Sequence, residues 1–376
     1  MRPTLKRTHI AVVGLFVMGC NTAAGAQSNL ERSIAANGDG PVQFAFASRD
    51  GVCGNGRSFY RVDDDGWYSV STTSGTFTTS TGMRSDACER GPVRVVVTRA
   101  GRDVVKVETF AGPLTPDAEA GRNLGIVSAR EAVQYLLSIA GSTEGRPARE
   151  AITPAMLGDS AVVAGPLLAI AKDKSRSRMV RRTAMSSASR RRSEPGGIGA
   201  AAVARALNEI VRDREEGEPI RQQALSTISS LDRGEGIPVL IGFADDGDEW
   251  IASQSIKTLA RSGDPRARAF TRDLIKSKNL PEGVSTEVIR GLGGDYATAA
   301  DYRLLRDLYP SLNNDRDRDA IISTLASAGG RENADWLLTL AKSPTETVAR
   351  RRRVINALAK FDDPRVRAAL KELIVK

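Results

Sequence analysis

The chain has 376 residues, of which 41% are hydrophobic, 5% aromatic and 26% charged, and its formal net charge is +9. This balance is that of a folded protein rather than a disordered one, and the length allows two domains. The scarcity of aromatic residues favours helices packed on helices over a β-sandwich with an aromatic core.

Residues 1–26 have the pattern of a secretory signal peptide. A basic start is followed by an apolar run at 10–18 and by the small-residue cleavage site Ala24-Gly25-Ala26. The apolar run is too short for a stable membrane anchor. The sequence therefore predicts an exported protein, periplasmic or extracellular. In an alternative interpretation, residues 17–20 are a degenerate lipobox, and Cys20 would carry a lipid anchor.

Cleavage after Ala26 would remove three of the 54 basic residues and also His9, which is the only histidine. The mature chain would then lack the residue that Ser-His-Asp and Cys-His sites require. It would also lack the commonest metal ligand. We therefore expect a protein that is not an enzyme and has no metal or small-molecule cofactor.

Residues 27–41 are expected to be flexible, and residues 42–112 to form a small β module. Apolar residues alternate in 42–46, and two β-branched runs, 93–98 and 104–107, flank a short turn containing glycine. This pattern predicts a hairpin, and further strands are expected at 59–62 and 67–70. A linker over 113–127 would end the module.

Cys53 and Cys88 lie within the β module. In an exported protein such a pair indicates a disulfide. Closing a loop of about 35 residues would stabilise the module by about 3–4 kcal/mol in the chain-entropy model.

From residue 128 to 376 the apolar spacing becomes three and four, which is typical of helices. A mostly apolar dipeptide, a gap of two residues and an apolar anchor recur at intervals of 40, 31, 33, 33 and 33 positions. The anchors are Ala188, Ile228, Leu259, Leu292, Leu325 and Leu358. Another apolar residue lies eighteen positions before most anchors, so each unit holds two helices. Such a fixed period is typical of an α-solenoid.

The units resemble short HEAT-like repeats. The resemblance rests on Val180-Arg181 and Ile220-Arg221, each followed by an alanine three positions after the arginine, and on the closing turn Gly263-Asp264-Pro265. It covers about 165–376, and the sequence departs from it at Asp317 and Arg350, which replace an apolar residue. With the signal peptide and the β module, the layout looks like that of exported bacterial HEAT-repeat proteins. The resemblance implies a mainly α fold, an αα-solenoid, but no defined activity.

Arginines are the candidate partner-binding residues. They are Arg181, Arg182, Arg221, Arg318, Arg350, Arg351, Arg352 and Arg353. Four of them lie seven positions before an anchor and would form a ladder along stacked helices. This ladder is either a basic groove for an acidic partner or a set of bridges between neighbouring repeats, and the HEAT resemblance favours the bridges.

We expect a scaffold or adaptor that binds a protein partner on the solenoid surface. Binding of an anionic polymer or a membrane surface through the arginine clusters is the alternative. A lyase-like activity is a remote third, because HEAT-like repeats also occur in bilin lyases. Nucleic acid is disfavoured by the export signal and by the absence of aromatic residues among the arginines.

Overall fold

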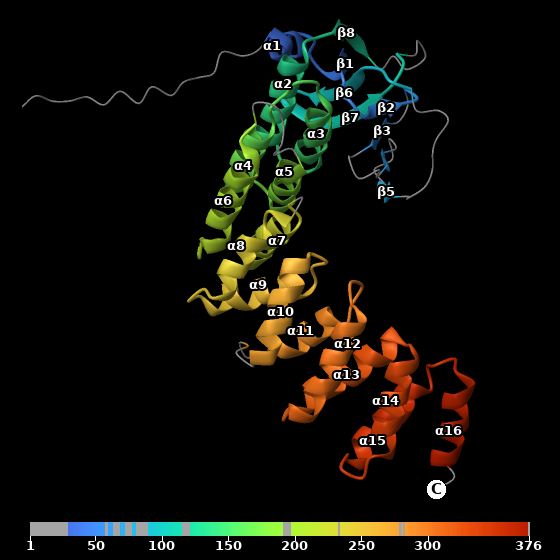
Figure 1. Cartoon of the computed structure of the whole chain (residues 1–376). Helices are drawn as coiled ribbons and strands as arrows, with labels where there is room; N and C mark the ends of the chain where they lie inside the picture. The colour runs from blue at the N-terminus through green and yellow to red at the C-terminus, as the bar shows by residue number, and fades with distance from the viewer. Residues whose placement is uncertain are drawn as a thin grey trace, which may run out of the picture.

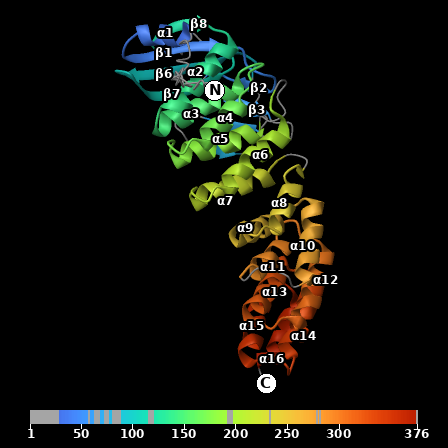
Figure 2. The same ribbon diagram turned by 90° about the vertical axis from the view of Figure 1, so that its left-hand side faces the viewer.

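The computed structural model describes residues 29–56, 59–62, 68–71, 77–79, 89–114, 121–190, 197–231, 234–277, 280 and 283–374. The predicted signal peptide, Cys20 and Cys88 lie outside these residues. A β module sits at one end of a long array of helices, and α16 lies at the other end (Figures 1 and 2).

Two four-stranded sheets form the β module. The first has the order β7-β6-β1-β8 and comprises β1 (Gly40–Phe46), β6 (Val93–Ala100), β7 (Asp103–Ala111) and β8 (Arg122–Ile126). The second is an antiparallel meander of β2 (Val52–Gly54), β3 (Phe59–Val62), β4 (Tyr68–Ser71) and β5 (Phe77–Thr79). The hairpin expected from the two β-branched runs is β6–β7.

Arg94 joins the two sheets. It projects from β6, is 8% exposed, and its guanidinium donates to the carbonyl of Gly56 at 3.1 Å and to Gln43 Oε1 at 3.3 Å. The ring of Phe110 lies 4.0 Å from its guanidinium carbon. Burial lowers the pKa of Arg94, because the charged form loses water.

Two segments differ from the sequence expectation. Within the stretch expected to be flexible, Asn29–Ala36 forms α1, whose buried Leu30 and Ile34 face the core. Glu131 Oε1 accepts a hydrogen bond from the Leu30 backbone at 2.7 Å. Within the expected linker, β8 pairs parallel to β1. Both elements are short and depend on tertiary partners, so local periodicity does not reveal them.

The helices form two stacked layers, which confirms the predicted αα-solenoid. One layer holds the first helix of each pair, the A helices: α2 (Ala129–Ser142), α4 (Ala164–Lys172), α6 (Gly199–Arg212), α8 (Ile237–Ala244), α10 (Pro265–Ser277), α12 (Ala299–Leu308), α14 (Arg331–Lys342) and α16 (Pro364–Ile374). The other holds the B helices: α3 (Gly145–Leu157), α5 (Arg178–Arg190), α7 (Glu218–Ser229), α9 (Glu249–Ala260), α11 (Ser285–Leu292), α13 (Asp315–Ala328) and α15 (Val348–Leu358). Consecutive B helices pack against each other along the array.

The six anchors all lie on B helices and have no exposed surface. Of their A-helix counterparts, Ile170, Ile210 and Leu308 are buried, whereas Ile241, Leu274 and Leu340 are half-buried. The core runs without interruption from Phe44 and Phe46 in β1 through the first helix pairs. The sheet therefore covers the end of the solenoid and shares its core. A second apolar cluster spans α9 to α16.

We expect Leu325→Ala to lower the free energy of unfolding by about 2–5 kcal/mol, because the cavity on α13 cannot collapse against packed neighbours. Ser323→Ala, an exposed change on the same helix, is the control. Denaturant unfolding followed by circular dichroism measures both. Equal losses in the two variants would contradict the anchor role.

Candidate functional site

The ladder arginines of the first repeats form hydrogen bonds within the array. Arg181 is 5% exposed, and its Nε donates to the carbonyl of Ala171 at 2.8 Å. Its Nη1 donates to Glu216 Oε1 at 3.1 Å, in the turn of the next helix pair. Burial opposes ionisation of Glu216, but the hydrogen bonds from Arg181 outweigh it and lower the Glu216 pKa. Arg181 thus connects an A helix, a B helix and the following repeat.

Arg221 repeats this arrangement one unit later. Its Nε donates to the carbonyl of Val211 at 2.7 Å, and its Nη2 lies 4.0 Å from Asp248 Oδ2. The guanidinium also stacks 4.0 Å from the ring centre of Trp250. Carbonyls at a helix C-terminus lack partners within the helix, and here an arginine ten positions on satisfies one.

Arg318 and Arg351 occupy the same register position in later repeats and are half-buried. Arg318 lies over the ring of Tyr309, with 5.6 Å between its guanidinium carbon and the ring centre. The Nε atoms of both arginines are buried and make no hydrogen bond to any residue that the structure describes. These four arginines are therefore built into the repeat contacts to different degrees.

The remaining candidates divide between paired and free side chains. Arg350 is 6% exposed and binds Glu346 at 2.7 Å and Asp315. Arg353 pairs with Asp319. Arg182 donates to the neutral Gln223 Oε1 at 2.9 Å. Arg352 is exposed and forms no side-chain hydrogen bond or ion pair with the described part of the chain.

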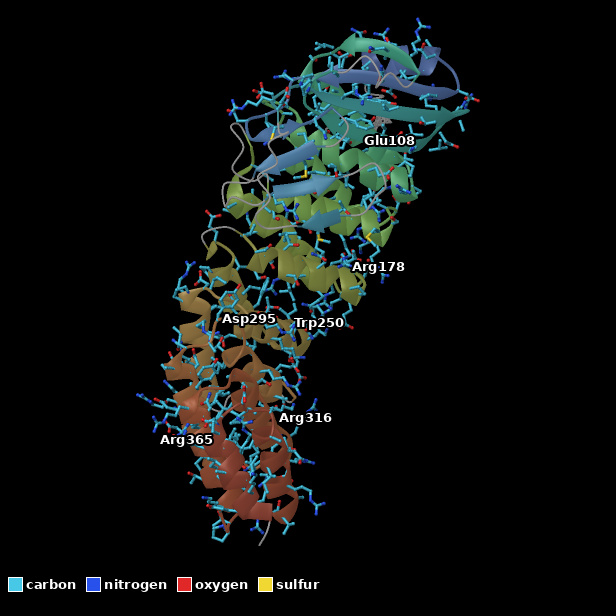
Figure 3. All side chains as sticks on the ribbon, turned by 90° about the vertical axis from the view of Figure 1, so that its right-hand side faces the viewer. Glu108, Arg178, Trp250, Asp295, Arg316 and Arg365 are labelled. Atoms are coloured by element: carbon cyan, nitrogen blue, oxygen red, sulfur yellow. The ribbon has the colours of Figure 1, made fainter. Side chains whose placement is uncertain are left out.

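The solvent side of the B helices, which we call the B face, carries several free cations. Arg178 and Arg182 on α5, Arg316 on α13 and Arg352 on α15 are exposed and have no acidic partner among the described residues. Figure 3 shows Arg178, Trp250 and Arg316 along one edge of the array, and Asp295 and Arg365 along the other. The B face therefore offers guanidinium groups that the repeats do not use.

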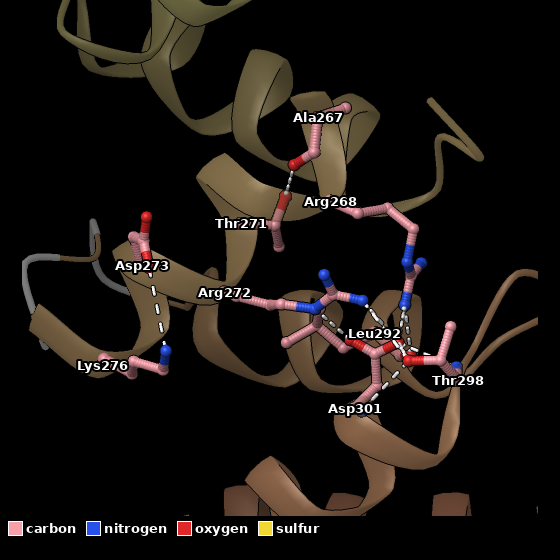
Figure 4. A network of polar contacts seen from close by, with 9 residues as sticks. All are labelled: Ala267, Arg268, Thr271, Arg272, Asp273, Lys276, Leu292, Thr298 and Asp301. Atoms are coloured by element: carbon pink, nitrogen blue, oxygen red, sulfur yellow. Dashed lines mark hydrogen bonds and ion pairs between the residues drawn. The ribbon is translucent and has the colours of Figure 1, made fainter. Parts of the chain in front are cut away.

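A buried carboxylate on α12, which we did not identify from the sequence, holds the middle of the array together. Asp301 has no exposed surface, and its oxygens accept from Arg272 Nε at 2.6 Å and from Thr298 Oγ1 at 2.7 Å. Arg268, 4% exposed, pairs with it at 2.9 Å and donates to the carbonyl of Leu292 at 2.8 Å (Figure 4). Burial opposes ionisation, but these hydrogen bonds hold the pKa of Asp301 well below its usual range.

One sequence signal could have led to this network. Thr298 and Asp301 form a capping box, in which each side chain bonds the backbone of the other. The arginines are one helical turn apart on α10, but nothing in the sequence says that they reach α12.

Asp317, which replaces an apolar residue of the repeat pattern, is also a buried carboxylate with partners on another helix. It is 4% exposed and accepts from Ser285 Oγ at 2.6 Å and Thr286 Oγ1 at 2.5 Å, both on α11. A polar contact between neighbouring B helices therefore takes the place of an apolar one.

Among the described residues, no group of three or more His, Cys, Asp or Glu side chains is arranged to hold a metal ion. The described helices include none with the length and apolar character to cross a membrane.

No protein-family profile and no curated protein matches the sequence. Two solved structures with HEAT-like helical repeats are similar in arrangement. The complex of CpcE and CpcF of phycocyanin lyase from Nostoc shares 13% identity at a TM-score of 0.31, covering 57% of this chain and 87% of that one. Human deoxyhypusine hydroxylase in complex with glycerol shares 13% identity at a TM-score of 0.28, covering 65% and 96%.

The prediction that the chain is not an enzyme, made from the absence of a histidine after cleavage, is wrong. Both similar structures carry the names of enzymes, a lyase and a hydroxylase. A helical-repeat fold therefore does not exclude catalysis. At this identity and TM-score the likeness concerns the fold alone and gives this chain no activity.

We expect Asp301→Asn to lower the free energy of unfolding by about 3–5 kcal/mol, because Arg268 stays buried without a counter-charge. Asp273→Asn is the matched control, since Asp273 pairs with Lys276 at 3.8 Å and both are exposed. That control should cost less than about 1 kcal/mol. Denaturant unfolding at neutral pH measures both, and similar losses would contradict the network.

Stability should also fall in acid in a way that depends on Asp301. The pKa of Asp301 is depressed in the folded state. Its contribution to the free energy of unfolding is therefore complete above the pKa of an unfolded aspartate, about 3.9, and declines as the pH falls below that value. Between about pH 5 and pH 3, the wild type should lose more stability than Asp301→Asn, as measured by unfolding curves across that range. Parallel losses would show that other carboxylates carry the acid sensitivity.

Proposed function

We propose that the protein is an exported scaffold or adaptor that binds a protein partner on the B face of its solenoid. The observation that carries this proposal is the set of exposed arginines on the B helices. Arg178, Arg316 and Arg352 form no ion pair with a described residue, whereas the acids Glu216, Asp315 and Asp319 are bound to other arginines. Stacked repeats offer an extended surface of the kind that solenoid proteins use for partners.

Charge on the B face supports a protein partner over an anionic polymer. Arg181, Arg350 and Arg353 are bound to Glu216, Asp315 and Asp319, so much of the local positive charge is neutralised. The exposed apolar side chains Met179 and Val348 lie beside the free arginines. A mixed apolar and basic surface fits a protein with some acidic residues.

The lyase complex that shares the helical-repeat arrangement is a complex of two proteins. This agrees with partner binding but does not supply the proposal, which rests on the free arginines.

The partner proposal predicts protein adducts from the B face. A photoreactive residue at Arg316 or Arg352 of the full chain should capture a discrete protein, whereas one at Arg205 or Arg303, exposed on the A helices, should not. With the captured protein purified, Arg352→Glu should raise Kd at least about tenfold, because a like charge replaces the cation.

The dependence of this binding on salt separates the two candidate partners. A packed protein interface should weaken mildly as salt rises, whereas an anionic polymer should be lost steeply. Equal adducts from both layers of helices, or steep salt dependence with heparin as the preferred ligand, would contradict the partner proposal.

We also propose the export and the disulfide. The basic, apolar and small-residue pattern of residues 1–26 supports export. Gly54 and Glu89, the residues after Cys53 and Cys88 in the sequence, exchange two backbone hydrogen bonds of 2.9 Å. This pairing supports a disulfide between the two cysteines.

Mass spectrometry of the mature protein tests both features. A mature chain beginning at Gln27 and a non-reduced peptide that links Cys53 to Cys88 are expected. A lipid on Cys20 would instead show that the mature protein is lipid-anchored. Free thiols at Cys53 and Cys88 in the mature protein would contradict the disulfide.

A further inference from the structure

An apolar strip crosses three successive B helices. Met179 on α5, Pro219 on α7 and Trp250 on α9 each lie nine positions before the anchor of their helix. Because α5, α7 and α9 pack side by side, equivalent positions lie next to one another. Met179 is 51% exposed, Pro219 is exposed and Trp250 is half-buried. These three residues, the apolar strip, lie on the B face.

The strip is held in place before any partner binds. The indole Nε1 of Trp250 donates to Glu218 Oε1 at 3.2 Å, and Arg221 stacks on its ring. Pro219 is fixed in the first turn of α7. A surface whose side chains are already ordered loses little conformational entropy on binding.

Positive charge borders the strip at α5. Arg178 and Arg182 flank Met179 in the sequence and are exposed, and Figure 3 shows Arg178 on the same edge as Trp250. Neither arginine forms an ion pair with a described acid, because Glu216 is bound to Arg181, and Glu218, which keeps its charge, accepts a hydrogen bond from Trp250. The α5 end of the strip therefore favours a carboxylate.

We propose that the apolar strip docks an extended, acidic and apolar segment of another protein. Its apolar side chains contact Met179, Pro219 and Trp250, and a carboxylate pairs with Arg178 and Arg182. Neighbouring helices lie about 8–10 Å apart, so about six extended residues cross the three helices. This inference rests on the proposed function, because it places the partner at one part of the B face.

Two features favour a peptide segment over an anionic polymer. The strip presents apolar side chains rather than cations, and one face of its tryptophan is already covered. A polyanion needs a row of cations. At the position nine residues before the anchor, α5, α7 and α9 present the apolar residues Met179, Pro219 and Trp250, and of these four helices α13 alone presents a cation, Arg316. Base stacking needs free aromatic faces, and one face of Trp250 is covered by Arg221.

Selection from a random peptide library on the purified full chain tests the proposal. The enriched peptides should combine apolar and acidic residues. Synthesised and measured by fluorescence anisotropy, they should bind at least tenfold more weakly to Met179→Asp and to Arg182→Glu. Both residues are exposed, and thermal unfolding checks that the variants fold. Arg205→Glu, the matched charge change at an exposed position of the A helix α6, should alter Kd less than twofold.

Three results would overturn the proposal. They are enriched peptides without acidic residues, equal binding to the strip variants and the wild type, and heparin or anionic vesicles displacing all selected peptides without dependence on Met179. A photoreactive residue at Met179 separates this inference from the proposed function. A partner captured from Arg316 or Arg352 but not from Met179 would keep the B face as the binding surface and remove the strip.

Discussion

The array depends on arginines that reach in two directions. Arg181 donates backward to the carbonyl of Ala171, near the end of the preceding A helix, and forward to Glu216 in the next repeat. Arg221 makes the same backward contact with Val211. One side chain thereby satisfies a helix end that would otherwise lack a partner and sets the distance between repeats. Since both guanidinium groups are largely withdrawn from water, their acidic partners must be present for the contact to be stable.

Later repeats achieve the same connection with different residues. Asp301 gathers two arginines of α10 at the start of α12, and Asp317 accepts hydroxyl hydrogen bonds from α11. Each joins elements that belong to different repeats, as Arg181 does. The fold therefore requires a satisfied polar contact between repeats, while the residue that provides it varies along the chain.

This internal use of charge determines what the surface can do. A chain with many arginines would present a broad basic face if they were all free. Because Arg181, Arg350 and Arg353 are paired, the B face carries a few separate cations with apolar side chains beside them. Such a surface distinguishes between partners by their shape and by single charge pairs rather than by their total charge. The β module, which shares its core with α2 and α3, covers one end of the array.

The sequence by itself determined the repeat, because burial of one side of each helix imposes a period on the apolar residues. All six anchors, the two-layer order and the β6–β7 hairpin followed from that period and from turn chemistry. It did not reveal α1, β8 or the Asp301 network, and it could not tell Arg350, which is buried, from Arg352, which is exposed. These features depend on which carboxylate or backbone group lies opposite, often about thirty positions away. Only the tertiary structure brings such residues together, since the apolar period shows which side of a helix is buried but not which residues contact that side.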